Sequence, residues 1–245
     1  MKKFFLFIVI LSIAGLSVQA QLVTSSLTKE TSKKGYQSIY FQWNPSTIKS
    51  DGLDHDFIRT DEDYLREILI DDASYHFTGM TMGYSRAFNL TQDFPLFLEI
   101  GGALQYSFAD NSYSAYNLDT MKIGTVSPDI TFVSIKVPLK LICNWDIANN
   151  FTIAPYAGIT TRFNVWGHYD VFYDITNYNK AYSGNNMFSK KGLGWKRFQI
   201  GWQIGANFKF QNFLYLGASY GTDFNSFTSD HAKIHTTSVT LGFIF

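Results

Sequence analysis

The chain has 245 residues, with 20 basic and 20 acidic side chains, five histidines and a single cysteine. The balanced charge argues against a nucleic-acid-binding protein, which would carry a basic surplus, and the lone Cys143 excludes an internal disulfide as a source of stability. Aromatic residues make up 18% of the chain, with 23 Phe and 15 Tyr, a composition typical of membrane β-barrels, whose alternating strands average to a neutral hydropathy.

Residues 1–20, MKKFFLFIVILSIAGLSVQA, predict a secretory signal peptide that is cleaved near Ala20. Two lysines precede an apolar core, and small residues stand before the expected cleavage site. Its removal leaves 18 basic against 20 acidic residues, because Lys2 and Lys3 are lost. No cysteine follows the cleavage site, so a lipoprotein anchor is not expected. Residues 21–245 are predicted to form one outer-membrane β-barrel domain.

Eight segments alternate apolar with small or polar side chains, and this period of two indicates β-strands. In the clearest segment, 196–210, a row from Phe198 to Phe210 is apolar, while the row from Arg197 to Lys209 is polar or glycine. The pattern predicts an all-β fold, an eight-stranded antiparallel up-and-down transmembrane β-barrel. The segments span residues 36–43, 76–88, 95–108, 130–143, 151–166, 196–210, 213–223 and 234–245.

The connections between these segments alternate strictly between short and long, which predicts the orientation of the barrel. Outer-membrane barrels have short periplasmic turns and longer outer loops, so both termini are expected on the periplasmic side. This places the protein in the outer membrane of a Gram-negative bacterium, in contact with outer-membrane lipid and lipopolysaccharide. Four tryptophans at strand ends are expected at the interface between lipid and water: Trp43, Trp145, Trp166 and Trp195.

A soluble lipocalin-like barrel would show the same alternation with its apolar face inward. The polar rows favour the membrane barrel, because their charges stand among Gly, Ala and Ser, a mixture suited to a narrow, filled lumen. Glu99 and Lys140 are predicted to form an ion pair there, with their charged atoms within about 6 Å of each other. A hydrated plug is favoured over an anion-attracting pathway. The expected lumen polar network is Glu99, Lys136, Lys140, Arg162, Arg197, Gln199, Gln203 and Lys209.

Two features of the strands have a specific interpretation. The last apolar row resembles the signal that barrel-assembly machinery reads on a terminal strand; it comprises Val239, Leu241, Phe243 and Phe245. Arg86 falls in an apolar row, either because its long side chain snorkels to the interface or because a bulge shifts the alternation.

The pair VSIKVPLKLICNW (133–145) and NNFTIAPYAGITTRF (149–163) resembles the IPLLLKY and PYxG strand pair of the PorT-like outer-membrane β-barrel family. The match departs from that pattern at Lys140, which precedes Leu141-Ile142-Cys143 instead of the usual Tyr. The resemblance implies a small outer-membrane barrel of a type linked to secretion or adhesion. It implies no catalytic residues.

The predicted outer loops carry the remaining candidate sites. The acidic stretch DGLDHDF (51–57) is interpreted as a solvated loop in preference to a calcium site, because the spacing of a known calcium loop is missing. Residues 60–69 predict a short helix over the barrel mouth. The tyrosine-rich segment 169–182 predicts a hairpin that extends the strands outward.

A lipid A-modifying enzyme is the catalytic alternative, and its side chains would be His168, His231, His235, Ser226, Ser229 and Asp230. No spacing among them marks a nucleophile and its base, so no catalytic residue, cofactor or metal ligand is assigned. We therefore expect a monomeric, non-enzymatic barrel with a structural or interaction role in adhesion or envelope assembly. A narrow channel for small solutes is the second alternative.

Overall fold

The computed structural model describes residues 35–49, 69–70, 74–91, 94–116, 121–148, 150–176, 178–188, 194–211, 213–227 and 232–245. The predicted signal peptide and the acidic stretch 51–57 lie outside these ranges. Of the predicted helix 60–69, only Leu69 is described, and it belongs to a short strand. No helix in the described part of the chain is long and apolar enough to cross a membrane.

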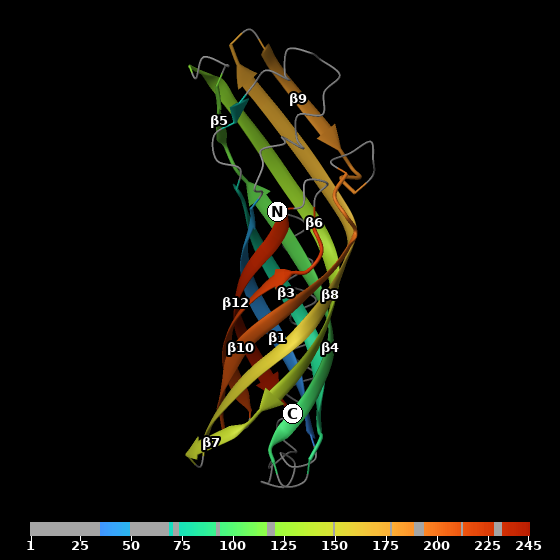
Figure 1. The fold of residues 1–245 in the computed structure, drawn as a ribbon, viewed down its shortest axis with the longest axis vertical. Helices are drawn as coiled ribbons and strands as arrows, with labels where there is room; N and C mark the ends of the chain where they lie inside the picture. The colour runs from blue at the N-terminus through green and yellow to red at the C-terminus, as the bar shows by residue number, and fades with distance from the viewer. Residues whose placement is uncertain are drawn as a thin grey trace.

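Eight long antiparallel strands form a closed barrel, as predicted (Figure 1). Each strand is hydrogen-bonded to the next one along the chain, and the last closes on the first, with Ile39 opposite Phe243. Closure leaves none of the eight with a fully unpaired edge. The strands are β1 (Gly35–Lys49), β3 (Ser74–Asn89), β4 (Leu96–Asp110), β6 (Lys122–Cys143), β8 (Phe151–Ile175), β10 (Phe198–Phe210), β11 (Leu214–Asp223) and β12 (Lys233–Ile244).

The two ends of the barrel differ. At the short-turn end, tight connections join β3 to β4 and β10 to β11, and the short β7 (Trp145–Ala148) pairs with β8. Figure 1 shows the C-terminus at this end, at the bottom of the view. The opposite, long-loop end holds the connections β1–β3, β4–β6, β8–β10 and β11–β12.

A sheet rises beyond the barrel at the long-loop end, as Figure 1 shows at the top of the view. It forms because β6 and β8 are 22 and 25 residues long and stay paired as far as Gly124 and Ile175. We call this the rising sheet: the outer parts of β6 and β8, together with β2 (Leu69–Ile70), β5 (Tyr113–Tyr116) and β9 (Tyr178–Gly184). The β8–β9 pair is the hairpin predicted over 169–182.

The outer wall of the barrel is apolar. Trp202 and Phe208 lie on this wall, 36% and 39% exposed, so the lipocalin-like alternative, which would place them inside, is wrong. Other exposed apolar side chains come from all parts of the barrel and include Met80, Ile100, Leu104, Ile135, Val137, Leu139, Ile159, Ile204, Leu216, Val239 and Leu241.

Arg86 lies on this outer face without a bulge, since the β1–β3 ladder runs in unbroken register past Gln37 and Arg86. Its guanidinium carbon is 5.1 Å from the centre of the Phe88 ring. The alternation is therefore regular at this point. Of the two explanations, the structure excludes the bulge.

Three of the four strand-end tryptophans, Trp43, Trp145 and Trp166, are exposed on the outside. Trp195 is not, because it is 1% exposed and packs against Phe227, with 4.7 Å between ring centroids. The expectation that Trp195 sits at an outer interface is wrong. The segment before β10 folds inward over the barrel mouth and carries this indole with it.

Candidate functional site

The interior of the barrel, its lumen, is closed at the short-turn end by an ion pair among tyrosines. Lys140 and Glu99 stand directly opposite on β6 and β4, and the Lys140 Nζ donates to Glu99 Oε1 at 2.8 Å. Both side chains are buried. The ammonium also lies 5.6 Å and 5.0 Å from the ring centres of Tyr40 and Tyr156, where aromatic faces attract a cation. The predicted ion pair is confirmed.

Lys209 completes this layer from β10. Its Nζ donates to Asn144 Oδ1 at 2.9 Å and lies 3.9 Å from the centre of the Tyr36 ring. Tyr215 is buried in the same layer. We call this layer the tyrosine floor: Tyr36, Tyr40, Tyr156 and Tyr215 around Glu99, Lys140 and Lys209.

Glycines in the facing strands make room for the floor tyrosines. A Cβ added to Gly83 would collide with the ring of Tyr40, and one added to Gly242 would collide with the ring of Tyr215. The glycines of the polar rows therefore provide space that a narrow lumen needs for large side chains. This packing explains why glycine and charge alternate in the inward rows.

Above the floor, Arg162 pairs with Asp223. The Arg162 Nη2 donates to Asp223 Oδ2 at 2.7 Å, with the two side chains 7% and 12% exposed. Lys136 stands opposite Arg162 in the β6–β8 ladder. The amide of Gln203 lies close by, because all four residues line one small cavity.

Neutral polar side chains form a hydrogen-bonded chain in the lumen, and the predicted lumen network includes Gln199 of this chain. Ser134 donates to Asn164 Oδ1 at 2.6 Å, and the Asn164 amide donates to Gln199 Oε1 at 2.6 Å. Gln199, which is fully buried, in turn donates to the Lys196 carbonyl at 2.6 Å. These residues satisfy one another's hydrogen bonds, as buried polar groups must.

A second polar chain crosses between β12, β1 and β3. Ser238 donates to Asn44 Oδ1, and the Asn44 amide donates to Thr81 Oγ1, each at 2.7 Å. All three side chains are buried. The alternation in the sequence places these three residues in inward rows, but they carry no charge and so did not stand out as members of a lumen network.

An aromatic roof closes the lumen at the long-loop end. We use this name for Phe77, Phe132, Trp195 and Phe227, each at most 4% exposed. Phe77 lies 5.6 Å from Phe132 and 6.0 Å from Trp195, measured between ring centroids. The fully buried Met187, Ile48 and Phe227 belong to the same apolar cluster.

The roof was missed in the sequence, although Phe77 and Phe132 fall in the inward rows of Gly79 and Ser134. Its cluster continues into one face of the rising sheet, where Val126, Val171 and Tyr173 are buried. Burial, reinforced by the neighbouring Tyr182 and Tyr169, raises the pKa of the Tyr173 hydroxyl well above its usual value.

Arg197 does not join the lumen residues with which it was grouped. It precedes β10, and its Nη1 donates to the carbonyls of Asn164 and Val165 at 3.1 Å and 2.9 Å. Its guanidinium also lies 5.2 Å from the centre of the Phe188 ring. Arg197 therefore ties the segment before β10 to the rim at the long-loop end.

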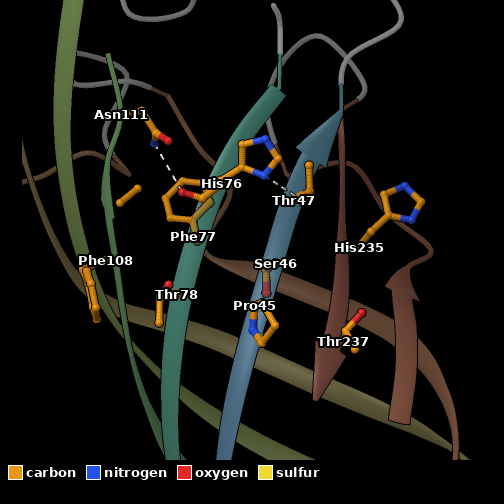
Figure 2. Close-up of a pocket in the computed structure, with 11 residues that line it drawn as sticks. Pro45, Ser46, Thr47, His76, Phe77, Thr78, Phe108, Asn111, His235 and Thr237 are labelled. Atoms are coloured by element: carbon orange, nitrogen blue, oxygen red, sulfur yellow. Dashed lines mark hydrogen bonds between the residues drawn. The ribbon is translucent and has the colours of Figure 1, made fainter. Parts of the chain in front are cut away.

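A hollow of about 440 Å³ opens at the barrel wall near this rim. Figure 2 shows Thr47 of β1 between His76 of β3 and His235 of β12, in agreement with the ladder pairs that join Thr47 to each histidine. The His76 Nδ1 is 3.3 Å from Thr47 Oγ1, and His235 Nδ1 is 2.9 Å from the Tyr220 hydroxyl.

The proposed lipid A-modifying side chains are not brought together. His168 contacts Asp170 at 3.1 Å and Asn185 at 2.8 Å, but β8 is separated from the β12 strand of His235 by β10 and β11. Ser226 accepts a hydrogen bond from Lys196, and His231, Ser229 and Asp230 lie outside the described residues. The described residues also contain no group of three or more His, Cys, Asp or Glu that could hold a metal ion.

No protein-family model matches the sequence. No curated protein matches it either. Similar solved structures include Ail, the attachment invasion locus protein of Yersinia pestis, at 13% identity over 86% of this chain and 99% of that chain, with a TM-score of 0.42.

Two further solved structures are similar. Neisserial surface protein A is 11% identical over 85% of this chain and 97% of that one, with a TM-score of 0.39. The outer membrane protein OprG from Pseudomonas aeruginosa is 11% identical over 87% of this chain and 98% of that one, with a TM-score of 0.36. These structural neighbours are small outer-membrane β-barrels.

Proposed function

We propose that the protein is a non-conducting, non-enzymatic outer-membrane barrel of a Gram-negative bacterium and that it acts through its rising sheet, in adhesion or envelope assembly. A closed barrel satisfies every strand's backbone hydrogen bonds within the wall, which is what hydrocarbon surroundings require. The apolar outer wall and the polar, charged lumen have the polarity of a barrel embedded in lipid.

The observation that carries the proposal is that a layer of buried side chains lies across the lumen at each end. The tyrosine floor closes the short-turn end, and the aromatic roof closes the long-loop end. A side-chain-filled barrel offers solutes no open path, so the narrow-channel alternative is disfavoured. The surface available for function is then the part of the chain beyond the roof.

The rising sheet has features of an interaction surface. Among the described residues, β9 forms a strand ladder only with β8, which makes it an edge strand of the rising sheet. Open edges accept an extended segment of a partner through backbone hydrogen bonds. On the face away from the apolar cluster, Phe172 is 52% exposed and available for contact.

We also propose a family, a mode of membrane insertion and an oligomeric state for the protein. Membership of the PorT-like family is supported by the position of its two motifs, which lie on the neighbouring strands β6 and β8, with Pro138 paired to Thr160. Recognition by barrel-assembly machinery is supported by the outward row of β12, where Val239 and Leu241 are exposed. We further propose a monomer whose signal peptide, residues 1–20, is removed.

Photo-cross-linking on intact cells tests this function. A photoreactive phenylalanine analogue at Ala181 of β9 should give adducts with an envelope or extracellular partner. The same analogue at Ile147 of β7, which is 62% exposed at the short-turn end, is the matched control and should not give those adducts. Absence of adducts at Ala181, or the same adducts at both positions, would contradict a role for the rising sheet.

A further inference from the structure

A cavity of about 50 Å³ lies within the barrel, between the tyrosine floor and the aromatic roof. Its charged lining consists of Lys136 from β6, Arg162 from β8 and Asp223 from β11. Gln203 lines it from β10, and Phe227 of the roof lies 5.9 Å from the Arg162 guanidinium carbon. The cavity is therefore lined by the five neighbouring strands β6, β8, β10, β11 and β12.

Two buried nitrogen donors in the lining have no acceptor among the described residues. Arg162 is 6% exposed, and its Nε is buried without a hydrogen-bond partner in the described structure. The Gln203 Nε2 is likewise buried and unpartnered. Lys136 makes no hydrogen bond or ion pair with a described residue. Each of these nitrogens can only donate, and a buried donor without an acceptor is costly.

The charges of the lumen point the same way. The cavity has three charged groups, of which two are cations and one is an anion. Asp223 forms its ion pair with Arg162, so among the described residues Lys136 has no carboxylate partner of its own. In the floor, the carboxylate of Glu99 is already paired with Lys140. Lys136 is half-buried, and an ammonium removed from water is unfavourable unless it has a counter-charge, so the cavity favours one additional negative charge.

We propose that this cavity is a binding site for one small monovalent anion of the halide type. An anion accepts hydrogen bonds from all the orphaned donors and supplies the missing charge, whereas a water molecule also brings two donors that need acceptors. The hydroxyls of Thr160 and Thr236 line the same space and can donate to it as well.

The size of the cavity restricts the ligand. A volume of about 50 Å³ exceeds the roughly 10–15 Å³ that a single water needs. It accommodates a chloride or bromide ion with a little water, but not a nucleotide or a sugar. The anion would lie on the barrel side of the roof.

Refolding in different salts tests the site. The protein is refolded into detergent in sodium bromide or in sodium gluconate at equal ionic strength, because gluconate is too large for the cavity. We expect a higher Tm in bromide, and in crystals grown from the bromide sample an anomalous peak within hydrogen-bonding distance of Arg162 Nε and Gln203 Nε2.

Matched variants locate the effect. Lys136→Met removes the surplus charge from the cavity and should abolish the bromide-dependent rise in Tm. Lys209→Met makes the same chemical change in the floor, where the ammonium is held by Asn144, and should keep it. Gln203→Glu supplies a carboxylate in place of the anion, so it should also lose the bromide dependence while remaining folded.

The outcomes separate the proposal from its alternatives. Equal Tm values in both salts together with no anomalous peak would show that the cavity holds only water, and would overturn the proposal. A bromide effect that persists in Lys136→Met and Gln203→Glu would place the anion elsewhere and overturn it equally.

Discussion

Arg162 reaches past β10 to bind Asp223, a residue two strands away around the barrel, with 2.7 Å between Nη2 and Oδ2. The pair ties three consecutive strands together inside the wall, next to the roof ring of Phe227. Removing one member of such a buried pair leaves the other charge without compensation.

We therefore expect Asp223→Asn to lower the free energy of unfolding by about 3–5 kcal/mol. Asp174→Asn, on the exposed part of β8, is the matched control and should change it by less than about 0.5 kcal/mol. Urea unfolding in lipid vesicles measures both. The double variant Arg162→Met, Asp223→Leu should recover most of the loss, and a loss equal to that of Asp223→Asn would argue against the pairing.

Gly83 leaves room for the ring of Tyr40 in the floor. Gly83→Ala should therefore cost about 1–3 kcal/mol through overpacking, and should slow barrel assembly as seen by heat-modifiable mobility on gels. Gly102 offers a matched control from the next strand, since a Cβ there meets no atom within 4 Å. Equal stability of Gly83→Ala and Gly102→Ala would contradict the proposed packing of the floor.

The aromatic roof is predicted to be the outer seal of the lumen. Trp195→Ala removes its largest fully buried side chain, which should lower stability by about 3–5 kcal/mol. Because the tyrosine floor closes the other end of the lumen, neither the variant nor the parent protein should conduct in planar bilayers. Trp43→Ala, which removes an exposed indole from the outer wall, should lower stability much less, and steady conductance by the parent protein would refute the seal.

A charge on the outer wall should be costly only where hydrocarbon touches it. Leu104 lies near the middle of β4 and is 61% exposed, and Met121, just before β6 at the long-loop end, is 63% exposed. Leu104→Arg should lower the free energy of unfolding by about 2–4 kcal/mol if the outer wall faces lipid. Met121→Arg should cost little, because it lies beyond the barrel. Vesicle-based unfolding that gave equal, small effects would indicate a wall surrounded by water.

The eight barrel strands were predictable because each one carries its own period-two signal, as in the row from Phe198 to Phe210. The pairing of Glu99 with Lys140 was predictable for a related reason: both residues lie in inward rows of adjacent strands, a few residues from the short-turn ends of those strands. Local sequence thus encoded the wall and one of the ion pairs inside it.

The roof and Arg197 could not be predicted in this way. The roof forms by contact between strand ends and loop residues such as Trp195 and Phe227, which are distant in sequence from Phe77 and carry no periodic signal. The prediction that Arg197 lies in the lumen failed because the apolar–polar alternation in the sequence includes this residue, whereas β10 begins one position later, at Phe198. The alternation of side chains between two faces predicts the direction of a side chain only for residues within the strand.

Lipid quenching of Trp202 tests the central claim most directly, because this indole lies mid-strand on the apolar outer wall. With the other four tryptophans replaced by Phe and the protein reconstituted in vesicles, acyl chains brominated at increasing depth should quench Trp202 fluorescence, most strongly for bromines within the hydrocarbon core. Fluorescence that is indifferent to brominated lipid would place Trp202 away from the bilayer and contradict the account of an outward apolar wall around a sealed polar lumen.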